Sequence, residues 1–154
     1  MQRFLAPLQN WLKAAAILCC ALFFSFAITP SATAIELSHA PEDAEAYIIA
    51  PQDGETVSPK FTVQFGLSGM GVAPAGVQKE NTGHHHLLID LAELPELTEP
   101  LAATDNIKHF GGGQTETQLS LSPGEHTLRL VLGNYSHVPH DNPVISAPIT
   151  VQVQ

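Results

Sequence analysis

The chain has 154 residues, with fifteen acidic and six basic side chains, two cysteines and a formal net charge of −9 when histidine is neutral. Two of the basic residues, Arg3 and Lys13, lie in the N-terminal segment, so residues 35–154 keep four basic side chains against all fifteen acidic ones. This charge argues against nucleic acid as a partner, because an acidic surface repels phosphate. Both cysteines, Cys19 and Cys20, also precede residue 35, so the remaining chain has no disulfide, thiolate ligand or thiol nucleophile.

Residues 1–34 have the features of a secretory signal peptide. After the two basic residues comes an apolar run, 14–28, which is shorter than a typical membrane span. Pro30 and the small-residue motif at 32–34 then form a cleavage site. We therefore expect a periplasmic or secreted protein with no membrane span after cleavage. A signal that stays uncleaved and anchors the chain is the alternative.

The rest of the sequence predicts short β-strands. Residues 35–46 are polar and acidic, and we expect a flexible lead-in there. In residues 47–154, apolar and polar side chains alternate in short segments between glycine- and proline-rich turns, which is typical of strands with one buried face. The predicted strands are 47–50, 60–67, 83–91, 118–121, 126–132 and 149–153. Six to eight strands predict a single all-β domain, an immunoglobulin-like antiparallel β-sandwich, with a small closed barrel as the alternative. Pro148 favours an edge position for the last strand.

Three consecutive histidines begin the strand at 83–91. Because side chains alternate along a strand, His84 and His86 share one face and His85 lies on the other. Asp90 shares the face of His84 and His86 and should point to water. We therefore expect that face to be polar and the other face to be the core. Two imidazoles on one strand face can bind one metal ion together. The middle histidine then needs a hydrogen-bond partner inside the core.

A metal site needs at least one more ligand, and histidines in three predicted loop positions can supply it. Loops between strands gather at the two ends of a sandwich, so these loops can meet the start of the histidine-rich strand. Three histidines with an open coordination position would suit a catalytic or copper-type ion, and the metals we expect are copper and zinc. The predicted metal ligands are His84, His86, His109, His137 and His140.

A structural role for the histidines is the alternative. Three adjacent histidines can also form a strand end whose polar groups hydrogen-bond to the loops. His126 shares a strand face with three leucines, which favours a buried, hydrogen-bonded histidine over a metal ligand. His39 lies in the expected lead-in. Three successive glycines, 111–113, are interpreted as a structural turn rather than as an anion-binding loop.

Five segments match the motifs of a known family in the same order: FGLSGMGVAPAG, ENTGHHHLLID, HFGGGQTET, PGEHTL and GNYSHVPHDNPV. On these motifs the chain resembles a family of bacterial exported proteins, domain of unknown function four-three-nine-nine, over about residues 47–153. The resemblance implies an exported, compact, single-domain protein and no catalytic residues. Asn134 stands where the family usually has aspartate, and Asn142-Pro143 where it usually has two prolines.

Three classes of function are compatible with these features. The first is an exported module that binds copper or zinc through its histidines. The second is an adhesion or scaffold domain of the cell envelope that binds protein or glycan, with structural histidines. The third, a metal-dependent hydrolase or redox enzyme, is the least favoured, because it needs an open coordination position and a substrate cleft, and the sequence indicates neither. Nucleophilic catalysis is also disfavoured, since the sequence has no GxSxG motif.

Overall fold

The computed structural model describes residues 37–154, so the predicted signal peptide lies outside the described residues. Between residues 37 and 154, no helix has the length and apolar character needed to cross a membrane. Part of the predicted lead-in packs against the domain. Ala40 is fully buried, and its N–H donates a hydrogen bond to Asp141 Oδ1 at 3.2 Å.

Nine strands lie within residues 37–154. They are β1 (Glu45–Ala50), β2 (Glu55–Val57), β3 (Lys60–Ser68), β4 (Gly71–Val72), β5 (Thr82–Ile89), β6 (Ile107–His109), β7 (Glu116–Ser120), β8 (Gly124–Gly133) and β9 (Ile149–Val153). The six segments with clear alternation correspond to β1, β3, β5, β7, β8 and β9. The remaining strands have two or three residues each, which is too short to show a period in the sequence.

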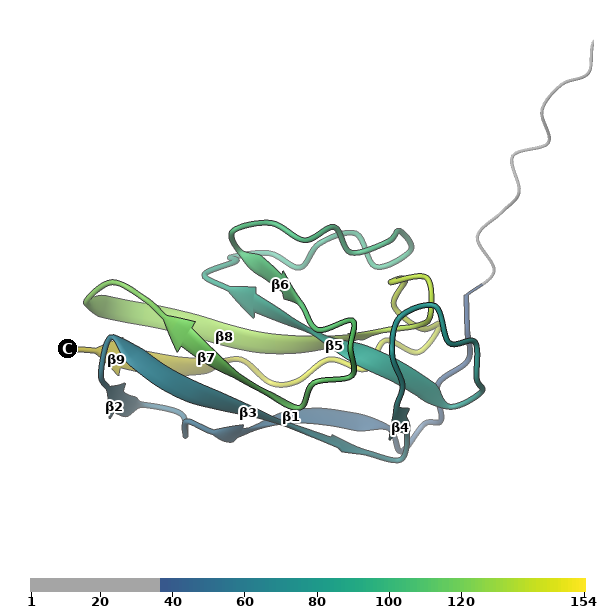
Figure 1. The fold of residues 1–154 in the computed structure, drawn as a ribbon, viewed down its shortest axis with the longest axis horizontal. Coiled ribbons are helices and arrows are strands. Elements are labelled where there is room, and N and C mark those ends of the chain that lie inside the picture. The colour runs from purple at the N-terminus through teal and green to yellow at the C-terminus, as the bar shows by residue number, and fades with distance from the viewer. Residues whose placement is uncertain (1–36) are drawn as a thin grey trace, which may run out of the picture. The chain divides into compact units, whose positions relative to one another are not determined.

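The strands form two sheets, which confirms the predicted all-β sandwich (Figure 1). One sheet has the order β1-β3-β7, and the other has the order β2-β9-β8-β5-β4, with β6 also paired to β5. Pairing is antiparallel except between β2 and β9 and between β4 and β5. The prediction of an edge position for β9 is wrong, because β2 pairs with one side of it and β8 with the other. Pro148 precedes β9, so its missing N–H removes no bond from the ladder.

The main core lies between the two sheets. The alternating residues of β8 supply three fully buried leucines, and both β5 and β3 add apolar side chains. Burying one such leucine contributes about 1.5–3 kcal/mol to folding. Among the members of this core are Val63, Phe65, Leu87, Ile89, Leu119, Leu128, Leu130, Leu132 and Val151.

A second, smaller apolar cluster lies on the outer face of the larger sheet. Leu88 of β5 packs there against Leu101 and Ile107. In Figure 1, β6 and the loop before it lie on this side of β5, away from β1 and β3. The prediction that this face of β5 is polar and points to water is therefore wrong. His84 and His86 share the face of Leu88, and both histidines are fully buried under this cover.

Candidate metal centre

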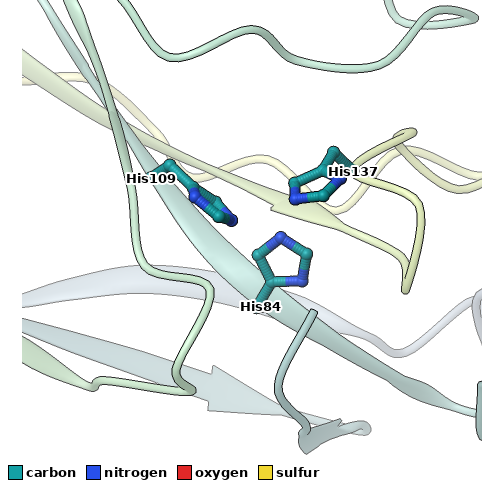
Figure 2. Close-up of side chains that lie close together, drawn as sticks. All are labelled: His84, His109 and His137. Atoms are coloured by element: carbon teal, nitrogen blue, oxygen red, sulfur yellow. The ribbon is translucent and has the colours of Figure 1, made fainter. Parts of the chain in front are cut away.

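Three histidines that are far apart in the sequence come together beside β5. His84 is on β5, His109 is the last residue of β6, and His137 lies in the loop after β8. One ring nitrogen of each lies within 4.8 Å of one ring nitrogen of both others. Figure 2 shows the three rings grouped around a common space. The arrangement allows three imidazoles to bind one ion.

The register between β5 and β6 positions His109. His109 is the antiparallel partner of His86, so the two side chains stand on the same face of the sheet. Their rings stack at 29° with centres 5.1 Å apart. The ring of His84 is two residues away on the same face, and its centre is 5.0 Å from that of His109. His109 itself is exposed, so the centre reaches the surface through this residue.

The loop after β8 holds His137 in a left-handed conformation with a φ of 70°. Asn134 builds this turn. Its Oδ1 accepts the N–H groups of Ser136 and Val138 at 2.8 and 3.1 Å, and its carbonyl accepts the N–H of His137 at 2.9 Å. From a separate loop, the N–H of Leu101 donates to the His137 carbonyl at 3.0 Å. A positive φ is uncommon for a residue with a side chain, so the surrounding bonds impose this position.

A fourth histidine, His86, borders the same three rings. Its ring centre is 4.9 Å from that of His84 and 5.1 Å from that of His109. The distance to the ring of His137 is longer, 6.1 Å. Gly133 leaves room for His86, because a Cβ at that position would lie 2.8 Å from Cε1 of the ring.

The buried imidazoles of this group lack hydrogen bonds. Neither ring nitrogen of His84 or of His86 has a partner within residues 37–154. A buried polar atom without a partner costs roughly 1–3 kcal/mol, so folded proteins contain few of them. The alternative in which these histidines serve as hydrogen-bonding struts therefore lacks the bonds that it requires.

Burial also keeps the imidazoles of His84 and His86 uncharged near neutral pH. It lowers the pKa of His84 to about 4 and the pKa of His86 to about 3. Repulsion between neighbouring imidazolium rings adds to this effect, since each ring would be charged beside the others. Partial desolvation and the nearby His137 lower the pKa of His109 as well. These rings are neutral at pH 7, which is the form of imidazole that binds a metal.

The segments that build this centre are also those that carry the family resemblance. Residues 63–154 match the family described as a domain of unknown function (DUF4399). The chain belongs to the DUF4399 family. No curated protein matches the chain. Among solved structures, the fibronectin(III)-like modules of Clostridium thermocellum CbhA are similar at 12% identity and a TM-score of 0.36, over 70% of this chain and 92% of theirs. Similarity at this level says nothing about function.

Two further buried histidines of the DUF4399 domain lie outside the group of four. His140, a predicted ligand, is 1% exposed, and its Nε2 is 3.3 Å from the carbonyl oxygen of Thr82. His85 faces the main core, where its ring centre is 5.3 Å from that of Phe65. Backbone groups of Gln114 and Gly66 lie near the His85 ring, but neither ring nitrogen makes a hydrogen bond of good geometry within residues 37–154. The structure thus brings together four of the five predicted ligands and leaves His140 apart.

The remaining histidines pair with carboxylates. His126 Nδ1 is 2.7 Å from Asp90 Oδ2, and its Nε2 is 2.9 Å from the carbonyl oxygen of Ser122. This confirms that His126 is hydrogen-bonded, but the residue is half-buried and not part of the core, whereas the sequence indicates a core position. The bond to Asp90 raises the pKa of His126. His39 pairs with Asp141 at 3.0 Å on the surface.

Two glycines shape the DUF4399 centre without binding anything themselves. Gly133 admits the ring of His86, and a Cβ at Gly111 would lie 2.6 Å from His109 Nε2. Residues 111–113 form the turn expected from their three glycines, whereas no sequence pattern singles out Gly133. The position of Gly111, two residues after His109, is the sequence feature that indicates its role. A residue without a side chain at this position leaves room for the ring of His109.

Proposed function

We propose that this chain is an exported module, periplasmic or secreted, that binds one transition-metal ion, copper or zinc. His84, His109 and His137 are the proposed ligands. The observation that supports this best is the convergence of three ring nitrogens within 4.8 Å of one another from three remote segments. One of those rings is fully buried and has no other partner in the described chain. An ion would satisfy it.

The chemistry of the donors supports copper or zinc over other ions. Calcium and magnesium prefer oxygen ligands, whereas neutral imidazole suits zinc and copper. Only histidines make up the ligand group within residues 37–154. The acidic charge of the chain also favours cations near its surface.

Calorimetric titration tests this function directly. Adding zinc chloride or copper sulfate to the purified protein at neutral pH should give one binding event per chain. His39→Ala is the matched control, because His39 is a surface histidine paired only with Asp141, and it should titrate like the parent. A titration that releases no more heat than the salt added to buffer would contradict the proposal.

Gly111→Ala should weaken zinc binding by roughly 10- to 100-fold, the usual cost of disturbing a group that supports a metal ligand. The added Cβ would lie 2.6 Å from His109 Nε2, so we expect the exposed ring to leave the position it holds beside His84. Gly112→Ala is the matched control, because its Cβ would meet the flexible side chain of Gln114 at 2.9 Å and no histidine. Competition with a chromophoric chelator measures both affinities, and thermal unfolding of the metal-free variants checks the fold. Equal affinities for the two variants would contradict this prediction.

A further inference from the structure

We infer that the centre is a closed, four-coordinate site in which His86 is the fourth ligand, built for a tetrahedral ion such as zinc. This inference rests on the proposed function and adds to it a coordination number and a class of ion. Structural zinc sites take four protein ligands in a tetrahedron, whereas catalytic zinc sites take three and leave one position for water. The fourth ligand therefore decides what the centre can do.

The four rings already stand near the spacing of such a site. Imidazoles that bind one tetrahedral ion through nitrogens at about 2.0 Å have ring centres about 5 Å apart. Five of the six distances between the ring centres of His84, His86, His109 and His137 lie between 4.7 and 5.1 Å. The sixth, between His86 and His137, is 6.1 Å, and the ring nitrogens of His86 do not belong to the group that meets within 4.8 Å, so these two rings must approach and turn toward the ion to complete the tetrahedron.

The surroundings of His86 leave it free for this role. Its ring is fully buried, and neither ring nitrogen has a hydrogen-bond partner within residues 37–154. It lies two residues from His84 on one strand, so both rings leave β5 on the same side. Gly133 provides the space that the ring occupies. The residue that must approach, His137, is in a loop rather than in a strand.

The geometry also selects among ions. Zinc has no geometric preference from its d electrons and accepts a tetrahedron readily, whereas copper(II) prefers tetragonal sites. Copper(I) is favoured by thiolate and thioether ligands, and the four rings supply neither. A tetrahedron of four imidazoles leaves no position for a water molecule. Such a centre holds its ion and does not generate a hydroxide for hydrolysis.

Cobalt(II) provides the test, because it occupies zinc sites and its visible spectrum reports coordination. Cobalt chloride added to the purified metal-free protein should give the intense bands of tetrahedral cobalt, and sodium azide should leave them unchanged. In His86→Ala and His86→Leu, azide should shift these bands, because a position has opened. Zinc affinity should fall at least about tenfold in both variants. The leucine variant fills the space that alanine leaves empty, and circular dichroism without metal checks that each variant folds.

Two results would overturn the closed site while the proposed function stands. In one, azide shifts the cobalt spectrum of the parent protein. In the other, both His86 variants keep the parent spectrum and the parent zinc affinity. Copper(II) binding with a tetragonal spectrum and no zinc binding would overturn the class of ion. If zinc, cobalt and copper all fail to bind, the proposed function itself fails. His39→Ala should behave like the parent throughout.

Discussion

The metal-free protein should become markedly easier to unfold as the pH falls from 7 to 4. The folded chain holds the pKa of His84 at about 4 and that of His86 at about 3, against 6.5 for an ordinary histidine. Below pH 6.5 the unfolded chain therefore binds protons that the folded chain cannot, and the free energy of unfolding falls until the folded pKa values are reached. Each unit of difference between the folded and unfolded pKa values corresponds to about 1.4 kcal/mol. His84 alone therefore lowers the free energy of unfolding by roughly 3 kcal/mol at pH 4.

Urea unfolding with a chelator present, at several pH values between 7 and 4, measures this loss. The double variant His84→Leu/His86→Leu is the control, since it keeps every carboxylate and removes two of the four buried imidazoles, leaving His85 and His140 in place. Its unfolding free energy should change less between about pH 6.5 and pH 5. His126 acts with the opposite sign, because its raised pKa contributes stability below pH 6.5 that is lost as the pH rises through the folded value. Equal slopes in the two proteins would contradict the prediction.

His84→Leu should stabilise the metal-free protein by about 1–3 kcal/mol and lower its zinc affinity at least about 100-fold. The stabilisation follows because two buried nitrogens without partners are replaced by an apolar side chain of similar size. The loss of affinity follows because His84 is the buried member of the proposed ligand set. Chemical unfolding with a chelator measures the first effect, and competition with a chromophoric chelator measures the second.

His39→Leu is the comparison for this variant. The side chain of His39 is 72% exposed, and its pair with Asp141 lies on the surface, where such pairs contribute about 0–1 kcal/mol. Neither stability nor zinc affinity should change much. If His84→Leu instead loses more than about 2 kcal/mol of stability, the histidine is a structural strut, and an adhesion or scaffold role becomes the better proposal.

The fold was predictable from the sequence because its strands alternate. Leu128, Leu130 and Leu132 share one face of β8, and that face lies in the core as expected. Alternation also placed His84 and His86 together on one side of β5 and predicted that the missing ligands come from the loops. Of the predicted loop positions, His109 and His137 lie beside His84, but His109 ends strand β6 and only His137 is in a loop.

The burial of the centre could not be predicted, because it depends on long-range packing. The loop before β6 is rich in acidic residues and proline, and nothing local shows that Leu101 and Ile107 fold back over β5. Similarly, the register that pairs His109 with His86 is set by a strand of only three residues. His140 also lies in a turn-rich segment, a sequence context in which a surface ligand is expected. In the structure it is instead buried against Thr82. Alternation indicates which face a residue occupies but not what covers that face.

The loop contact at His137 has one further consequence. Its carbonyl accepts the N–H of Leu101, so the segment that supplies the third imidazole is tied to the segment that covers β5. An ion bound by His84, His109 and His137 would join β5, β6 and the loop after β8 at one point. It would act as a reversible cross-link in a domain whose residues 37–154 contain no cysteine. Gain or loss of the ion would then tighten or loosen the connection between these three segments, whereas a disulfide joins two segments permanently.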